Sequence, residues 1–183
     1  MEQIQERILS GEIRNLPFGP YEWRVSKVEK GRALLITEYV VEERPYHNPW
    51  ETVTWETCTL RKYLNAEFFE AFSAEEQAMI LKSDIKNPDN EEFGTPGGCV
   101  TKDKVFLISL QEADEYFVDD DDRSACDEKK GTHYWWLRSP GRDSSIASGV
   151  FQSGSVDNFG AYVTDDCGVR PALWLDLSSD KKG

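Results

Sequence analysis

The strongest constraint on the fold is a change of composition in the last third of the chain. Between Gly131 and Asp180 there is no Lys and no Glu, although both are frequent before it. Aromatic residues stand there instead, among Gly, Ser, Asp and Asn. Recognition surfaces are depleted in Lys and Glu, whose flexible stems are costly to immobilise, and they favour rigid aromatics mixed with small polar residues. The composition of this segment is therefore typical of a binding face.

The same segment predicts short strands, because glycines interrupt it at close intervals. Glycine adopts the positive φ that tight turns and bulges need. We expect strands over Tyr134–Arg138, Gly149–Gln152, Ala161–Thr164 and Val169–Leu175.

The first part of the chain predicts a mixture of strands and helices. Residues 1–20 read as a polar lead-in, and residues 21–183 as one domain. Alternating and continuous apolar runs predict strands over Trp23–Val28 and Ala33–Val41, and apolar residues at helical spacing predict a helix over Thr59–Phe72.

Two capping boxes predict helix starts. Ser73 with Glu76 begins a helix that we expect to reach Leu81, and Ser109 with Glu112 begins one that we expect to reach Phe117, after a strand over Lys104–Ser109. Residues 87–98 are predicted to form an irregular loop. The four aspartates 119–122 lack the spacing of a calcium loop and are predicted to form a solvated loop.

Length, charge and cysteine usage limit the class of protein. The chain has 183 residues and a formal net charge of −13, with no concentrated basic stripe. We therefore expect a single soluble domain with no nucleic-acid partner. The N-terminus does not resemble a signal peptide and no apolar run reaches bilayer length, which predicts no membrane span and a cytoplasmic location, unless a partner or a phage particle displays the protein elsewhere. The widely spaced cysteines predict free thiols.

No catalytic set is evident, and the sequence predicts no cofactor and no metal site. There is no nucleophile elbow and no phosphate-binding glycine loop. The alternative is an enzyme whose cleft would combine His133, Arg138 and Arg170 with the acidic stretch 112–128. A third possibility is a structural or assembly domain of a phage or surface particle.

Four large residues read as structural rather than functional. Trp135 and Trp136 lie on a predicted strand and are expected to pack in the core. Arg138 and Arg170 are expected to join loops by hydrogen bonds to carbonyl or carboxylate oxygens.

Several motifs occur in an order that carries a family resemblance. They are Tyr21-Glu22-Trp23-Arg24-Val25, Thr54-Trp55-Glu56, Cys58-Thr59-Leu60-Arg61, Lys104-Val105-Phe106-Leu107, Trp135-Trp136-Leu137-Arg138-Ser139-Pro140-Gly141 and Gly168-Val169-Arg170-Pro171-Ala172-Leu173. The set resembles a bacterial domain family of unassigned function. Its C-terminal half looks like the C-type-lectin-like fold of formylglycine-generating-enzyme-like domains and of the variable proteins of diversity-generating retroelements.

The resemblance implies an α+β fold, with two or three helices packed on small antiparallel sheets. It also implies that Trp23–Val28 pairs with Val169–Leu175. The chain lacks the calcium-binding triplets of sugar-binding lectins, and Cys167 stands alone where the formylglycine-generating enzymes have a cysteine pair. Neither calcium-dependent glycan binding nor their oxidase chemistry is therefore expected.

In the retroelement variable proteins, adenine-directed mutagenesis rewrites codons near the C-terminus. Almost every residue of 142–167 is of a type that this process can produce, with Gln152 the exception. By this resemblance the chain is a non-catalytic module that binds an unknown protein or surface ligand through 142–167, with Phe151, Phe159 and Tyr162 as anchors. The candidate contacts are Asp143, Ser144, Ser145, Ile146, Ser148, Phe151, Ser153, Ser155, Asp157, Asn158, Phe159, Tyr162 and Asp165.

Overall fold

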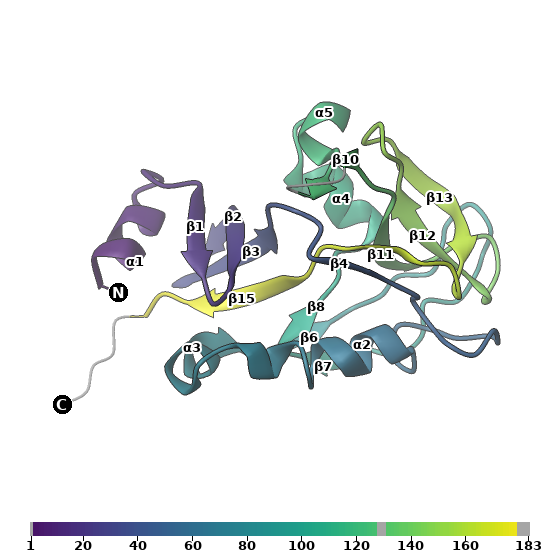
Figure 1. Ribbon diagram of the computed structural model, residues 1–183, viewed down its shortest axis with the longest axis horizontal. Helices are drawn as coiled ribbons and strands as arrows, with labels where there is room; N and C mark the ends of the chain where they lie inside the picture. Colours follow the sequence, from purple (N-terminus) through teal and green to yellow (C-terminus); the bar gives the residue numbers. More distant parts are fainter. Residues whose placement is uncertain (1, 128–130, 179–183) are drawn as a thin grey trace.

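The computed structural model of the protein describes residues 2–127 and 131–178. These residues form a mixed α+β fold with mostly antiparallel sheets and short helices (Figure 1). Two main sheets lie at opposite ends of the longest axis, and β15 runs from the middle of the molecule into the first of them. The structure therefore has the α+β class that the sequence predicts.

The first sheet contains the N-terminal strands and the closing strand. Its order is β1-β2-β3-β15-β5, with β8 also paired to β15. The bounds are β1 Asn15–Phe18, β2 Tyr21–Glu29, β3 Arg32–Thr37, β5 Ile80–Leu81, β8 Val105–Phe106 and β15 Ala172–Asp176. β3 is a run of apolar residues buried on both faces, as is usual for a central strand.

One predicted pairing is wrong in detail. The strand at Trp23 and the closing strand lie in the same sheet, but β3 separates them: Leu35 pairs with Val25 on one side and with Leu173 on the other. The tight turn at Lys30-Gly31 folds β3 directly onto β2. β3 therefore occupies the position beside β2 that we expected β15 to fill.

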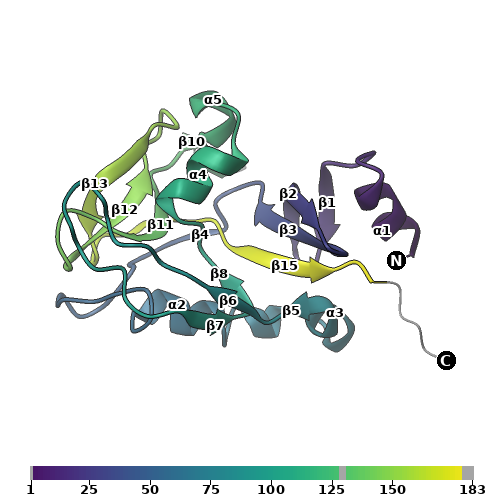
Figure 2. The same cartoon turned by 180° about the vertical axis from the view of Figure 1, so that it is seen from behind.

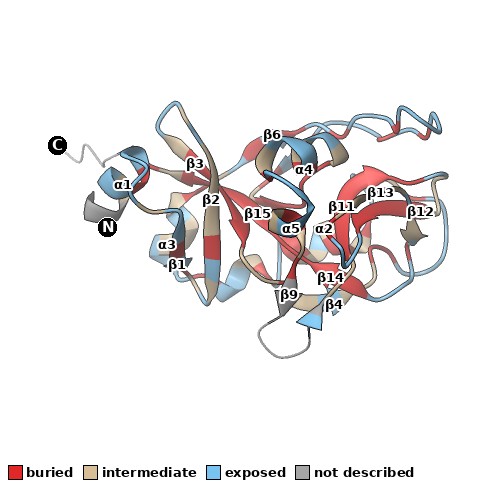
Figure 3. Ribbon diagram, turned by 90° about the horizontal axis from the view of Figure 1, so that it is seen from above, coloured by how far each residue is buried: buried red, intermediate tan, exposed pale blue. Residues whose placement is uncertain are grey.

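The second sheet is built from the glycine-rich segment. Its order is β13-β12-β11-β14-β4, so β13 is a terminal strand. The bounds are β4 Glu42–Arg44, β11 Trp135–Pro140, β12 Ile146–Val150, β13 Val156–Tyr162 and β14 Cys167–Val169. Three of the predicted strands lie in this sheet with bounds shifted by up to several residues, and bulges interrupt both ladders of β12. The fourth, predicted over Val169–Leu175, is divided: Val169 ends β14 in this sheet, whereas Ala172–Asp176 form β15 of the first sheet. Figure 3 shows buried residues concentrated in the strands and exposed residues in the helices and loops.

The remaining elements cover these two sheets. The helices are α1 Glu2–Leu9, α2 Thr59–Leu64, the 3-10 turn η1 Phe69–Ala71, α3 Ala74–Met79, α4 Leu110–Tyr116 and α5 Asp120–Arg123. Two further strand pairs are β6 Ser83–Ile85 with β7 Thr101–Asp103, and β9 Cys126–Asp127 with β10 Gly131–Thr132. Within the described residues, none of these helices is long and apolar enough to cross a membrane.

The predicted helix over 59–72 is shorter than expected. It ends at Leu64 because Asn65 is committed to tertiary contacts: its amide donates to the Val105 carbonyl at 2.7 Å, and its side-chain oxygen accepts from the Lys104 N–H at 2.8 Å. A turn and η1 follow, so the apolar periodicity continues without one continuous helix.

Both predicted capping boxes are confirmed. Ser73 and Glu76 cap α3, and Ser109 and Glu112 cap α4, each with both reciprocal hydrogen bonds. α3 ends at Met79 rather than Leu81 because Ile80 and Leu81 form β5 and pair with β15. The strand predicted over 104–109 is reduced to β8, which pairs with Ala172 and Leu173 of β15, and Ser109 already caps α4.

Two polar segments are more structured than predicted. The lead-in 1–20 contains α1, whose Ile8 is buried, and β1, which pairs with β2. The aspartate run forms α5 instead of a loop: Asp119 caps it, and Asp122 forms an ion pair with Arg24 at 2.9 Å. Arg123, at the end of the run, is buried and gives this short helix its attachment to the domain.

Candidate functional site

The predicted binding residues lie on the second sheet and on the loops at its ends. Three aromatics of this segment are exposed: Phe151 at 46%, Phe159 at 46% and Tyr162 at 54%. The other accessible candidates are exposed or half-buried; they are Asp143, Ser144, Ser145, Ser153, Ser155, Asn158 and Asp165. The structure thus places ten of the candidates where solvent reaches them.

Three of the candidates are buried, which corrects the expectation that they face a ligand. Ile146 packs beneath Gly141 and Gly160, and the Ser148 hydroxyl donates to the Pro140 carbonyl at 2.8 Å. Asp157 accepts hydrogen bonds from the Tyr134 hydroxyl and the Gly160 N–H, both at 3.1 Å. Ile146 and Ser148 lie on β12, which is buried along its whole length, and Asp157 lies on the adjacent β13, so all three hold the sheet together instead.

The loop 142–145, between β11 and β12, is held by hydrogen bonds at both ends. The Arg142 N–H donates to the Phe159 carbonyl at 2.9 Å, and the Val163 N–H donates to the Ser145 carbonyl at 3.1 Å. Asp143 accepts from the Ser145 hydroxyl and N–H, and these hydrogen bonds hold the pKa of the Asp143 carboxyl below its usual value. The loop is therefore fixed between the two exposed aromatics of β13, Phe159 and Tyr162.

Phe159 is the centre of a small cluster. Its ring meets Phe93 edge-on with centroids 6.0 Å apart, and the Arg142 guanidinium lies 4.7 Å from its centroid. We give the name aromatic patch to these three residues together with Tyr162, which is exposed three residues further along β13. Edge-to-face aromatic and cation–π contacts hold such side chains in one orientation while leaving much of their surface free.

Phe93 belongs to the segment 87–98, which the sequence predicts to be an irregular loop without a binding role. The loop 87–98 runs from the small β6–β7 sheet to β13 (Figure 2). Its anchor is Asn90, which is 2% exposed and donates from its amide to the Pro140 and Asn158 carbonyls, both at 2.9 Å. The Asn90 side-chain oxygen accepts from the Glu92 N–H and so turns the chain toward β13. The sequence signal for this contact is the pair Asp89-Asn90, which is typical of turns, shortly before the aromatic Phe93.

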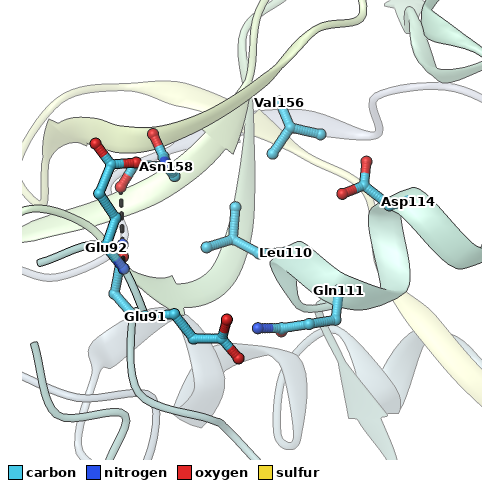
Figure 4. Close-up of a pocket in the computed structure, with 8 residues that line it drawn as sticks. Glu91, Glu92, Leu110, Gln111, Asp114, Val156 and Asn158 are labelled. Carbon is cyan, nitrogen blue, oxygen red and sulfur yellow. Dashed lines mark hydrogen bonds between the residues drawn. The ribbon is translucent and has the colours of Figure 1, made fainter. Parts of the chain in front are cut away.

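Further contacts fasten the same loop to the second sheet. The Thr95 hydroxyl donates to the Arg142 carbonyl at 2.8 Å, and the Asn87 amide donates to the Arg138 carbonyl at 3.1 Å. The Asn158 amide donates to the Glu92 carboxylate beside an open hollow of about 500 Å³, drawn in Figure 4. The aromatic patch therefore stands on a backbone fixed from two sides.

Gly160 shapes β13 at the patch. Its φ is +88°, and a Cβ at this position would lie 2.3 Å from the Ala147 carbonyl oxygen. Only glycine fits this conformation and this close approach. In a regular strand, residues three apart such as Phe159 and Tyr162 point to opposite faces. The irregularity at Gly160 lies between them, and both side chains are exposed.

Phe151 is exposed, but it is separate from the aromatic patch. It lies just after β12, where the hairpin to β13 begins, and packs against Tyr134 with centroids 5.7 Å apart. The tip of that hairpin is held by α5, because Arg123 donates to the Gly154 carbonyl at 2.8 Å. The three expected anchors therefore do not form one cluster.

The four residues that read as structural are all buried. The Trp136 indole N–H donates to the Arg44 carbonyl at 2.8 Å, and Trp135 lies under the Arg170 guanidinium at 4.8 Å. Arg170 donates to the Thr37 carbonyl. Arg138 donates to the Lys86 and Leu107 carbonyls and forms an ion pair with Glu112. These contacts agree with the expected structural role.

The residues of the alternative enzyme cleft have separate surroundings. His133 contacts Glu43 at 2.8 Å, Arg170 contacts carbonyls of Thr37 and Glu38, and Arg138 is engaged by Glu112. Arg138 does line a charged hollow of about 540 Å³ together with Tyr116. The ion pair and carbonyl hydrogen bonds of Arg138 already occupy its guanidinium, which leaves it little capacity to bind a substrate there.

The described cysteines are not activated nucleophiles. Burial raises the pKa of Cys58 and of Cys167 to about 12, and a hydrogen bond to Glu56 raises the pKa of the exposed Cys99. Thiolates are the reactive form, so these raised pKa values favour the less reactive protonated thiol at neutral pH. All three are free, and the side chain of Cys126 lies outside the described residues.

Among the side chains that the structure describes, no three from His, Cys, Asp or Glu are grouped so that they could hold a metal ion.

Comparison with known proteins gives one family. No curated protein matches the chain, and no solved structure matches it. The family model described as "Domain of unknown function (DUF6273)" matches residues 30–177. This match extends from the turn before β3 to the residue after β15, so it includes the whole second sheet, the first sheet without β1 and β2, and the whole aromatic patch. Since it covers most of the chain, the protein belongs to the DUF6273 family.

Proposed function

We propose that this protein is a non-catalytic binding module that recognises a protein partner through the aromatic patch. The observation that carries the proposal is the exposure of Phe159 and Tyr162 on a backbone that is fixed on both sides. Aromatic side chains and Arg provide most of the energy at protein interfaces. A rigid backbone lowers the entropy that is lost on binding.

The shape of the surface favours a protein over a small molecule. The patch residues project from a terminal strand and two loops, and their exposed fractions are large. Small-molecule sites are concave and bury most of their ligand. Flat, aromatic surfaces with a polar rim are characteristic of protein interfaces.

We further propose that the scaffold is C-type-lectin-like and that its surface is diversified. Support comes from the resemblance to retroelement variable proteins and from a first sheet that holds both the N-terminal strands and the closing strand. Diversification of this kind would spare the buried Ile146, Ser148 and Asp157. The test is the neighbouring DNA, which should contain a near-copy of the codons for 142–167 that differs only at adenines. Absence of such a repeat would remove the diversification part of the proposal.

The binding proposal is tested by selecting peptides from a displayed random library on the immobilised protein. Their affinity is then measured for Phe159→Ala and for Tyr162→Ala. Each change is expected to weaken binding by about 30-fold, which corresponds to about 2 kcal/mol for an interface anchor.

The matched control is Phe151→Ala, which removes an equally exposed aromatic from outside the patch. It should leave the affinity of the selected peptides within about 2-fold of the wild type. Peptides that bind Phe159→Ala and Tyr162→Ala as tightly as the wild type would show that the patch is not the binding surface.

A further inference from the structure

The hollow beside the aromatic patch has a distinct chemistry. It lies between β13 and α4 and has a volume of about 500 Å³ (Figure 4). Leu110 of α4 and Val156 of β13 supply apolar surface, while the carboxylates of Glu91, Glu92 and Asp114 stand around it. Of the eight described residues that line it, none is Lys or Arg.

The carboxylates of the hollow are only partly neutralised. Glu92 accepts from the Asn158 amide, which carries no charge, and Glu91 is exposed at the rim. Asp114 contacts Arg123 at 3.1 Å, but Arg123 also pairs with Asp120 at 2.7 Å. An excess of negative charge therefore remains over the hollow, in a chain whose net charge is −13.

The hollow and the aromatic patch are built on the same two segments of the chain. Asn158 and Glu92 line the hollow, and the residues that follow them in sequence, Phe159 and Phe93, pack against each other in the patch. β13 is the terminal strand of its sheet, so no further strand of the described chain covers it on this side. A short segment of a partner could therefore contact both the aromatic patch and the acidic hollow.

We propose that the partner inserts a Lys or Arg side chain into this hollow, next to an apolar residue that contacts the aromatic patch. The argument is complementarity of charge and shape. The aliphatic stem of a long basic side chain would lie against Leu110 and Val156, and its cationic head would meet the carboxylates. The partner segment is thus basic and apolar in alternation. This inference rests on the proposed function and assigns its partner chemistry.

The test uses a synthetic peptide, acetyl-Ser-Leu-Lys-Phe-Lys-Leu-Ser-amide, and two analogues in which Gln or Glu replaces both lysines. Binding is followed through the amide signals of the ¹⁵N-labelled protein. The lysine peptide should shift signals of residues 90–93, 110–114 and 156–159. The Gln analogue should bind at least about tenfold more weakly, and the Glu analogue should not bind.

A neutralised variant tests the hollow itself. Glu91→Gln, Glu92→Gln and Asp114→Asn together should weaken the lysine peptide by about tenfold or more. The matched control, Glu67→Gln, Glu70→Gln and Glu75→Gln, removes the same charge from exposed positions on the α2–α3 side. It should change the affinity by less than about twofold, which separates a local effect from a change in net charge.

The outcomes distinguish this inference from the proposed function. Equal binding of the lysine and Gln peptides, or equal losses in both triple variants, overturns the basic-segment inference. The Phe159→Ala and Tyr162→Ala measurements then decide the patch proposal on their own. The patch proposal fails if Phe159→Ala and Tyr162→Ala do not change the affinity for the selected peptides. If the neutralised variant still binds the lysine peptide more weakly than the wild type, the hollow binds cations without the patch.

Discussion

At the scale of single residues, a small number of polar side chains determine where the candidate surface lies. Asn90 is the clearest case, because one buried amide joins the loop 87–98 to the carbonyls of Pro140 and Asn158. Asp157 plays a similar part within the sheet through Tyr134 and Gly160. These side chains support the patch from beneath.

The Asn90 anchor gives a direct prediction. Asn90→Ala leaves buried carbonyls without donors and should lower the free energy of unfolding by about 2 kcal/mol. Urea unfolding measures the change. The neighbouring Glu91→Ala removes an exposed side chain and should cost less than about 0.5 kcal/mol. Equal stability of the two variants would contradict the role given to Asn90.

Residue burial also explains where sequence analysis erred. Ser, Asp and Asn are the commonest polar types both on recognition loops and in turns that hydrogen-bond their own backbone. Composition alone could not separate Asp165, which is exposed, from Asp157, which is buried. Phe93 was left out of the predicted site because it lies far in sequence from the composition change. Only the fold brings it to Phe159.

At the scale of elements, the starts of helices were predictable where residues close in sequence determine them. Both capping boxes were predicted, because the Ser and Glu of each box satisfy each other's backbone within four residues. Helix and strand ends were less predictable. α2 stops at Asn65 and α3 gives way to β5 because of partners distant in sequence, which no local pattern encodes.

The α3 capping box predicts a dependence of stability on acid. The Glu76 carboxylate accepts from the Ser73 N–H at 2.8 Å and from the Gly19 N–H at 3.1 Å, and chiefly the Ser73 contact holds its pKa below the usual 4.5. A folded-state pKa below the unfolded value contributes stability that is present above the unfolded pKa. That stability is lost as the pH falls through the folded-state pKa.

Glu76→Gln removes this titration. Between about pH 6 and pH 3, the free energy of unfolding of the variant should fall less steeply than that of the wild type. Chemical unfolding at a series of pH values is the measurement. Parallel curves for the two proteins would show that Glu76 does not contribute to the acid dependence.

At the scale of the whole molecule, the fold separates a buried scaffold from an exposed surface. The α+β class and the strand-rich C-terminal part were predictable from hydrophobic patterning and glycine spacing. The strand order was not predicted: the turn at Lys30-Gly31 pairs β3 with β2 locally, but the pairing of β15 with β3 joins strands from opposite ends of the chain, which no local pattern encodes. The attachment of 87–98 to β13 is likewise a property of the complete domain.

This separation predicts unequal effects of aromatic substitutions. Trp135→Ala removes a fully buried ring beneath Arg170 and should cost about 3 to 5 kcal/mol through the cavity that it leaves. Phe159→Ala and Tyr162→Ala together should cost less than about 1 kcal/mol, because both side chains are half exposed. Thermal unfolding measures the loss of stability in each variant. If the double variant is as unstable as Trp135→Ala, Phe159 and Tyr162 belong to the core and not to an exposed surface.

The central claim is that the protein binds its partner through the aromatic patch and the loops that hold it. Amide hydrogen exchange, measured with and without the tightest peptide from the selection, tests this claim without any mutation. We predict slower exchange in residues 91–94, 142–145 and 156–162, with little change outside these segments and the 110–114 wall of the adjoining hollow. Protection confined to other segments, such as β1 and α1 or the surroundings of β4, would contradict the claim.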